Sequence, residues 1–385
     1  MTARDDKFLG TVLVTGGAGI VGSYVIEELV KNPYCSKVVA TYHSAKSHQH
    51  ACDNVEYHVC DTTNATEVKS LLDQTHPKLI IHTVSPGPWA PADIQHQVNY
   101  LATKEIVIQA KEHQAIQALI YTSSLSAVYL YPASRGKAQT EEESELNSLE
   151  SSGFINAYGR TKGAADAFVL AANTGQKTNE VAGDFRGQLL TATLRVGGLY
   201  GERDLKTIFE MLKVVNTPAT RFQIGPDNAM HEWVHTSNVA QAHILAAEAL
   251  LDGLHTEAAN RVDGEAFFVT DNSPMPFWEF SRKVWIAAGD NYLNSSKTPR
   301  IMKVPFWLAI PIALVIEIVY KLFGQSTNEL KLDRLRLEYI KHGCRLSVDK
   351  AKSRLDYKPI CNTEDGIKRS VAWFLKKENE FWFQT

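Results

Sequence analysis

Near the start of the chain, Gly10–Asn32 has the sequence GTVLVTGGAGIVGSYVIEELVKN, and this stretch decides the fold. Its first part, Thr11–Thr15, is a short β-rich run of the kind found in buried strands. Glycines follow at 16, 17, 19 and 22, and apolar residues then recur at Val25, Ile26, Leu29 and Val30 with the spacing of a helix packed on a sheet. The stretch therefore predicts a strand, a tight turn and a helix in immediate succession.

The same alternation continues along the chain. Further β-rich or apolar runs occupy 37–42, 78–85, 118–124 and 189–196, and helical segments occupy 99–113 and 164–172. Strands that alternate with helices form a parallel sheet covered on both faces. We therefore predict an α/β fold with a doubly wound parallel sheet of the Rossmann type in residues 1–200. Residues 201–385 are expected to form a smaller, mainly substrate-binding part that also completes the core.

Composition excludes several classes of protein. The chain has 385 residues, 44% of them hydrophobic, which is enough for a large core and excludes a disordered protein. Its 40 basic and 43 acidic residues balance too closely for a nucleic-acid partner. The five cysteines are scattered, with no closely spaced Cys/His set, so we expect a reducing compartment and no metal site. The charged N-terminus lacks the apolar core of a secretory signal, and we expect a cytoplasmic protein.

The glycine turn fits a dinucleotide-binding site. Such a turn must be tight, its backbone must approach a pyrophosphate closely, and the next helix must offer free N–H groups to phosphate oxygens. The chain meets these conditions because the glycines stand between a predicted strand and a predicted helix. The predicted cofactor contacts here are Gly16, Gly17, Gly19, Ile20, Val21 and Gly22.

The end of the second strand bears on the choice between NAD and NADP. NAD-binding folds usually carry an acidic residue there, which holds the ribose 2′-hydroxyl. Tyr42 occupies that place, and Ser44 and Lys46 can contact a 2′-phosphate. We therefore expect NADP(H) to be favoured over NAD(H). Asp61 is expected to accept a hydrogen bond from the adenine amino group, with a helix cap or turn as its alternative role.

A tyrosine and a lysine lie four residues apart in Ala157–Lys162, AYGRTK. On a helix the two side chains share a face. An ammonium group beside the phenol, together with a nicotinamide ring, would lower the Tyr158 pKa and let Tyr158 exchange a proton with a substrate hydroxyl or carbonyl. Lys162 would also hold the nicotinamide ribose. The alternative is a Tyr/Lys pair on a helix surface.

Three hydroxyl residues, Thr122–Ser124, end a predicted parallel strand, where ligands bind in open α/β sheets. One serine can hydrogen-bond the substrate oxygen and orient it toward Tyr158. Because side chains alternate along a strand, only one serine faces the cofactor. We select Ser124 and leave Ser123 as the alternative.

These motifs resemble the extended short-chain dehydrogenases/reductases, and within them the 3β-hydroxysteroid dehydrogenase family, which includes the sterol-4α-carboxylate 3-dehydrogenases. The resemblance covers nearly the whole chain. Beyond the motifs above, it rests on IIHTVSP from Ile80, VNYLAT from Val98, LRVGGLYG from Leu194, NVAQAHILAAEAL from Asn238 and RLSVDKAKSRLDYKP from Arg345.

The resemblance implies that Ser124, Tyr158 and Lys162 are catalytic. It places Asn99 where its backbone helps to hold a water in the proton relay, and Thr83 beside the cofactor. It also implies a homodimer formed through the helices at 99–113 and 158–172.

The implied reaction is hydride transfer to or from a secondary alcohol or ketone of a bulky apolar polycycle such as a sterol, steroid or terpenoid. An NADPH-dependent ketone reductase of specialised metabolism is the alternative. A nucleotide-sugar epimerase or dehydratase fits less well, because the late apolar segment has no role there. A non-catalytic cofactor-binding protein has no need of the Tyr158/Lys162 pair.

That late segment, 304–324, has the sequence VPFWLAIPIALVIEIVYKLFG. It is only just long enough to span a bilayer, and Pro311 and Glu317 count against a clean span. A buried helix or dimer surface is one alternative. A second is a helix in a membrane surface with Trp307 and Tyr320 at the interface, which would associate the protein with the endoplasmic reticulum. A true membrane span is the third.

Overall fold

The computed structural model describes residues 8–43, 52–153, 155–175, 186–252, 261–295, 299–323, 330 and 333–376. Its centre is a seven-stranded sheet in the order β11-β6-β5-β4-β1-β2-β3, in which each neighbouring pair is parallel. The strands are β1 Gly10–Thr15, β2 Cys35–Tyr42, β3 Val55–Val59, β4 Leu79–His82, β5 Ala118–Ser124, β6 Leu190–Val196 and β11 Glu265–Val269. The predicted doubly wound α/β fold is confirmed.

The direction of winding reverses between β1 and β4. The chain builds outward from β1 to β3, returns to β4 on the other side of β1, and continues outward to β11. In open α/β sheets the ligand crevice lies outside the carboxyl ends of the strands at such a switch point. Here those ends are Thr15 and His82, so the glycine turn and the segment from Thr83 both open into the crevice.

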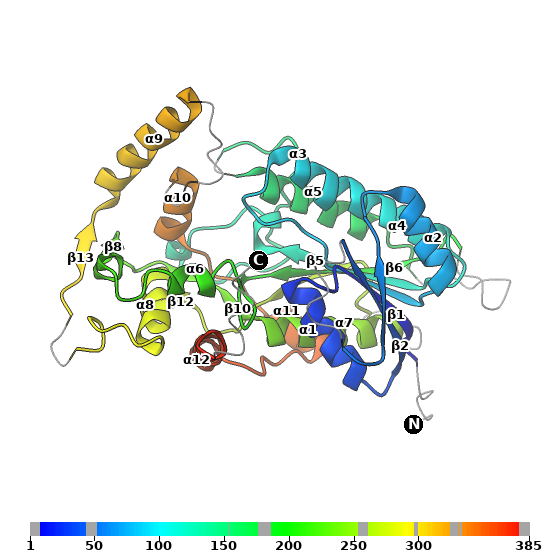
Figure 1. Cartoon of the computed structure of the whole chain (residues 1–385). Helices are drawn as coiled ribbons and strands as arrows, with labels where there is room; N and C mark the ends of the chain where they lie inside the picture. Colours follow the sequence, from blue (N-terminus) through cyan, green and yellow to red (C-terminus); the bar gives the residue numbers. More distant parts are fainter. Residues whose placement is uncertain are drawn as a thin grey trace.

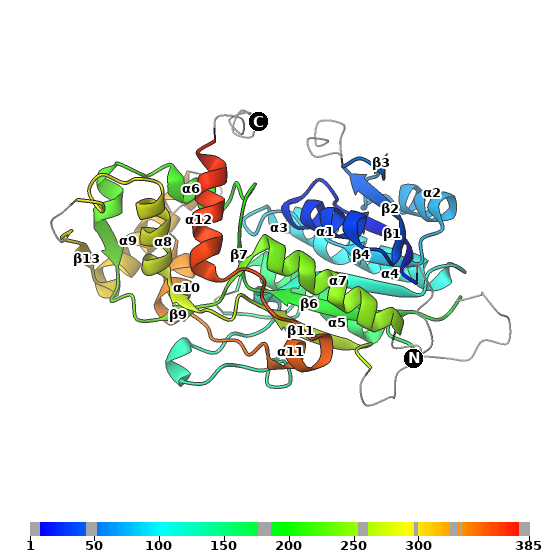
Figure 2. The same ribbon diagram turned by 90° about the horizontal axis from the view of Figure 1, so that it is seen from below.

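Two layers of helices cover the sheet (Figures 1 and 2). One face carries α1 Ile20–Lys31, α7 Thr236–Asp252 and α11 Asp349–Leu355, and the other carries α2 Ala65–Thr75, α4 Thr103–Glu112 and α5 Ala157–Ala171. Alternation along β1 supplies both cores, because Val12 and Val14 pack in the first and Leu13 in the second. Burial of each such side chain contributes roughly 1.5–3 kcal/mol, so β1 is fixed from both faces.

A smaller lobe lies at one end of the sheet (Figure 2). Its helices are α6 Ile208–Leu212, α8 Phe277–Ala287 and α12 Thr363–Phe374, and its short strand pairs are β7 Gly198–Tyr200 with β10 Trp233–His235, β8 Phe222–Ile224 with β13 Met302–Val304, and β9 Met230–His231 with β12 Met275–Pro276. Trp233 stacks on Phe280 with 3.7 Å between ring centroids and centres a separate apolar core. The lobe therefore has its own packing, while β11 and α7 from the same half of the chain join the main sheet.

The apolar segment forms α9 Phe306–Leu322, which projects from the molecule above α10 Arg334–His342 (Figure 1). Only part of α9 is covered, because Ala309 and Ala313 pack against Leu337 of α10. Its exposed apolar side chains are Trp307, Leu308, Ile312, Leu314, Val315, Ile318, Val319 and Leu322. A wholly buried helix is therefore excluded. Within the described ranges no helix combines the length and hydropathy needed to cross a membrane.

Candidate active site

The glycine turn is shaped so that side chains would block it. Gly16 has a φ of 73°, in the left-handed region that favours glycine. A Cβ on Gly22 would lie 2.3 Å from the Gly16 carbonyl oxygen, and one on Gly17 would lie 2.8 Å from the Cβ of Ala40. The N-cap of α1, Gly19, has no side-chain hydrogen bond, so a ligand can take the first N–H groups, at Ile20 and Val21. The turn fits the pyrophosphate of a dinucleotide.

Thr83 closes the other side of the turn. Its Oγ1 donates to the Thr15 carbonyl oxygen at 2.7 Å, and its backbone N–H donates to the same oxygen at 3.2 Å. The same hydroxyl would lie 3.1 Å from a Cβ on Gly16. Thr83 thus lies against the predicted cofactor turn and fixes its start.

The predicted adenosine contacts lie at the ends of β2 and β3. Tyr42 ends β2 with its ring 6.4 Å from that of Tyr57. Asp61 follows β3, and its Oδ1 accepts from the backbone N–H of Thr63 at 2.9 Å and from the Thr63 hydroxyl at 2.7 Å. Asp61 is therefore a turn residue, with its other carboxyl oxygen left for a further contact. Ser44 and Lys46 lie outside the described residues.

Ser124, Tyr158 and Lys162 meet at the carboxyl end of β5. Tyr158 and Lys162 lie in the first turns of α5, whose N-cap Asn156 accepts from the Gly159 N–H at 3.0 Å. The Tyr158 phenol lies next to Ser124, whose hydroxyl acts to lower the pKa of the phenol. The buried Lys162 Nζ donates to the Thr122 carbonyl oxygen at 2.8 Å. The structure brings the three predicted residues together.

The register of β5 distinguishes the two serines. Ser123 Oγ donates to Asp166 Oδ2 at 2.5 Å, within the core beneath α5. Asp166 also accepts two hydrogen bonds from the guanidinium of Arg195 on β6, at 3.1 and 3.0 Å, and both side chains are buried. Ser123 thus donates to the carboxylate of a buried ion pair, and Ser124 is the serine that lies next to Tyr158.

Burial has the largest effect on the pKa values of Tyr158 and Lys162. It raises the pKa of the Tyr158 phenol, while the neighbouring hydroxyls of Ser124 and Ser85 act in the opposite direction. Burial also lowers the pKa of Lys162 to about 7, and the nearby Asp166 carboxylate opposes this shift. The lowering of the Tyr158 pKa by the Lys162 charge, expected from the sequence, stays a prediction. The contribution predicted from the nicotinamide charge stays a prediction.

Sequence reasoning missed Ser85. Its hydroxyl donates to Asn99 Oδ1 at 2.8 Å and also lies near the Tyr158 phenol, whose pKa it acts to lower. Asn99 is fully buried in the π-helical turn His96–Ala102, which follows the short helix α3 Ala92–Gln95. The Asn99 side chain therefore reaches toward Tyr158 through Ser85, and the water that the resemblance places at the Asn99 backbone stays a prediction. The available signal was the place of Ser85 just after β4, at the switch point.

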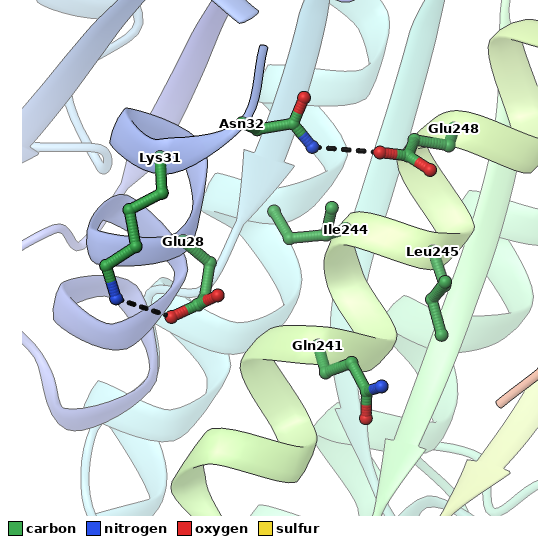
Figure 3. A pocket seen from close by; sticks show the side chains of 7 residues that line it. All are labelled: Glu28, Lys31, Asn32, Gln241, Ile244, Leu245 and Glu248. Atoms are coloured by element: carbon green, nitrogen blue, oxygen red, sulfur yellow. Dashed lines mark hydrogen bonds and ion pairs between the residues drawn. The ribbon is translucent and has the colours of Figure 1, made fainter. Parts of the chain in front are cut away.

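A pocket between α1 and α7 lies away from these residues (Figure 3). Two hydrogen bonds join residues that line it. Asn32 Nδ2 donates to Glu248 Oε1 at 2.8 Å, and Lys31 Nζ donates to Glu28 Oε1 at 2.9 Å. It adjoins the C-terminal end of α1, whereas the glycine turn precedes the N-terminal end. The pocket does not belong to the site.

The fold and this grouping define the class of extended short-chain dehydrogenases/reductases. The chain belongs to the 3-beta hydroxysteroid dehydrogenase/isomerase family, whose model matches residues 13–300. It is an NAD(P)-dependent oxidoreductase, as the resemblance implied.

Individual proteins support this assignment. The chain is 28% identical over 371 residues to the decarboxylating sterol-4-alpha-carboxylate 3-dehydrogenase of Saccharomyces cerevisiae, covering 95% of this chain and 98% of the relative. The enzyme of the same name from Candida albicans is 27% identical over 376 residues, covering 95% and 97%. Among solved structures, the Bordetella bronchiseptica enzyme WbmH in complex with NAD+ matches with a TM-score of 0.65 at 14% identity, covering 95% of this chain and 98% of that one. The last likeness concerns the fold alone.

Proposed function

We propose that this enzyme oxidises the 3-hydroxyl of a sterol that carries a carboxylate on the neighbouring carbon. The observation that carries the proposal is the grouping of Ser124, Tyr158 and Lys162 beside the glycine turn. The names of the similar fungal enzymes supply the substrate class.

The residues of the chain have the following roles in this reaction. Tyr158 takes the proton of the substrate hydroxyl, and Ser124 donates a hydrogen bond to the substrate oxygen as its charge develops. A nicotinamide cofactor held by the glycine turn and Lys162 would supply the acceptor for the hydride of the carbinol carbon. Ser85, held by Asn99, keeps the phenol aimed at that oxygen. The product is a ketone with the carboxylate in the β position. It loses CO₂ as the electron pair of the broken C–C bond forms an enolate, which then takes a proton.

The test uses the purified protein, a 4α-carboxy-3β-hydroxysterol and either oxidised nicotinamide cofactor. We expect reduced cofactor, CO₂ and the decarboxylated 3-ketone in equal amounts. Tyr158→Phe should lower the turnover rate roughly 100- to 10,000-fold, because the general base is lost. Tyr129→Phe, at a position 60% exposed, is the matched control. Isolation of a ketone that keeps its carboxylate would refute the decarboxylation step.

We further propose that NADP(H) is the preferred cofactor. The support is the absence of a carboxylate in Thr41–His43 at the end of β2, where one would repel a 2′-phosphate. Fluorescence titration should show tighter binding of NADPH than of NADH, and Tyr42→Asp should reverse the order. Tyr42→Phe is the control. Tighter NADH binding by the unchanged protein would overturn the preference.

We propose that α9 lies in a membrane surface, that of the endoplasmic reticulum in the cell. Its support is the row of exposed apolar side chains, with Trp307 76% and Val315 59% exposed. Glu317 does not oppose insertion of that face, because its carboxylate accepts from the backbone N–H and Nε of Arg334 at 2.7 and 3.0 Å. The protein should float with phosphatidylcholine vesicles, and Trp307→Glu with Val315→Glu should abolish flotation. Ile286→Glu on α8 is the control, and flotation unaffected by the double substitution would contradict the proposal.

We also propose a homodimer formed through α4 and α5. Leu101 and Ile108, each 36% exposed, supply apolar surface at α4 and the turn before it. Light scattering should give twice the mass of the chain, and Ile108→Glu should give the monomer. A monomeric unchanged protein would end this proposal.

A further inference from the structure

Lys206 reaches from the smaller lobe to the catalytic part of the molecule. It follows β7 in the turn before α6, and the Asp204 carboxylate fixes this turn by accepting from the backbone N–H groups of Lys206 at 2.9 Å and Thr207 at 3.0 Å. The Lys206 Nζ lies only 2.9 Å from the place where a Cβ on Gly87 would stand. The ammonium group therefore lies against the loop that follows β4, and glycine at position 87 leaves room for it.

That loop belongs to the active site. Ser85, two residues before Gly87, contacts both Asn99 and Tyr158. The loop is also held in place, because Gln95 Nε2 donates to the Gly87 carbonyl oxygen at 2.6 Å. A group bound between Lys206 and the loop would thus lie on the same loop as Ser85, the residue next to the catalytic phenol.

The ammonium of Lys206 has no hydrogen bond or ion pair with any residue in the part of the chain that the structure describes. The neighbouring Asp204 carboxylate is engaged by backbone N–H groups, including that of Ile208 at 3.0 Å. Burial among the surrounding atoms lowers the pKa of Lys206, and Asp204 opposes the shift. By contrast Lys213, just after α6, pairs with Glu210. Lys206 is exposed, so its ammonium is accessible to an anionic ligand, and no counter-ion from the described residues has to be displaced.

We propose that Lys206 binds the carboxylate of the acidic sterol substrate. This inference rests on the proposed function and deepens it by assigning an anion subsite. The cofactor pyrophosphate is not the expected anion, because its place is the glycine turn at the end of β1. Pairing with the ammonium stabilises the substrate carboxylate itself, so Lys206 promotes binding and selects acidic over neutral sterols. It gives no direct help to the loss of CO₂, in which that charge leaves the carboxylate.

The experiment compares Lys206→Met with the unchanged full-length enzyme on two substrates, a 4α-carboxy-3β-hydroxysterol and the same sterol without the carboxyl group. A hydrogen bond to a charged group is worth about 1.5–3 kcal/mol, so kcat/KM for the acid should fall roughly 10- to 150-fold, mainly through KM. The value for the neutral sterol should not change. Lys206→Arg should restore part of the loss, and Lys213→Met should leave both values unchanged.

Three results would overturn the inference: no loss with the acid, an equal loss with both substrates, or weaker NADPH binding by Lys206→Met, which would place a cofactor phosphate at the ammonium. These failures leave the proposed function intact when Tyr158→Phe still abolishes sterol oxidation. If the unchanged enzyme oxidises neither sterol, the proposed function fails. Calorimetric titration of the NADPH-bound protein with the acidic sterol then tests Lys206 separately, and equal affinity in the unchanged protein and Lys206→Met would refute it.

Discussion

The buried ammonium of Lys162 lowers the stability of the fold, although the active site needs this residue. Its pKa is lowered to about 7 by burial, whereas an unfolded lysine titrates near 10.4. Below about pH 7 both states are charged and the full desolvation cost opposes folding. Between the two pKa values the unfolded chain binds more protons than the folded one, so stability rises with pH.

We therefore expect Lys162→Met to stabilise the protein more at pH 6 than at pH 9, because methionine has no charge to desolvate. Urea denaturation at both pH values measures the difference, and the exposed Lys69→Met is the control. The variant should also lose most of its oxidoreductase activity. A gain in stability that is the same at both pH values would show that burial does not perturb the lysine.

Individual residues of the site were predictable to different extents. The spacing of Tyr158 and Lys162 located both, because a helix puts residues four apart on one face. Ser124 was only preferred over Ser123, since the deciding contact is with Asp166, 43 residues away. Ser85 was missed for a similar reason, because its partners Asn99 and Tyr158 lie on other elements. Side chains that meet only through tertiary packing leave no periodic signal in the sequence.

At the scale of elements, the position of α5 depends on its close contact with the segment after β5. A Cβ on Gly163 would lie 2.1 Å from the Asn147 carbonyl oxygen and 2.6 Å from that of Ala127. Backbone atoms cannot yield as the end of a side chain can, so the helix itself must shift. Because Tyr158 and Lys162 are on the same helix, the shift would move both relative to Ser124.

We therefore expect Gly163→Ala to lower kcat at least tenfold, since misplacement of catalytic groups by about 1 Å can cost about 100-fold. Stability should fall by an amount typical of overpacking, about 1–3 kcal/mol. Steady-state kinetics and thermal unfolding measure the two effects. Ala167→Ser, at an exposed position of α5, is the control for a substitution in the same helix. Unchanged kcat in Gly163→Ala would mean that α5 is not held by this contact.

The elements themselves followed from sequence wherever strand and helix periodicities were clear. The core strands β1, β2, β4, β5 and β6 and the helices α1, α4 and α5 were expected near their observed positions. The edge strands β3 and β11 were not assigned, and β11 joins the sheet from beyond the predicted core domain. The apolar composition of α9 did not reveal its exposure, because apolar composition alone does not distinguish a core from an interaction surface.

At the scale of the whole molecule, Glu202 links the cofactor-binding part to the smaller lobe. Its carboxylate accepts from the Tyr24 phenol of α1 at 2.8 Å, lies 3.0 Å from His235 Nε2 at the end of β10, and lies 3.2 Å from the Arg369 guanidinium of α12. Burial alone would raise the pKa of Glu202. The hydrogen bond and charge of His235 outweigh burial and lower this pKa to about 2.

This shift predicts how the link between the two parts depends on pH. A carboxyl group whose folded pKa lies below its unfolded value of about 4.3 stabilises the fold above that pH, and the stabilisation is lost as the pH falls toward 2. The shift corresponds to a contribution on the order of 3 kcal/mol near neutral pH. Glu202→Gln should therefore be markedly less stable than the unchanged protein in urea at pH 6, and the difference should shrink steadily between pH 4.5 and pH 2. Glu364→Gln, which removes an exposed carboxylate paired with Lys283, should show only a small difference. Equal stability of Glu202→Gln and the unchanged protein at pH 6 would mean that the two parts are held together by apolar packing alone.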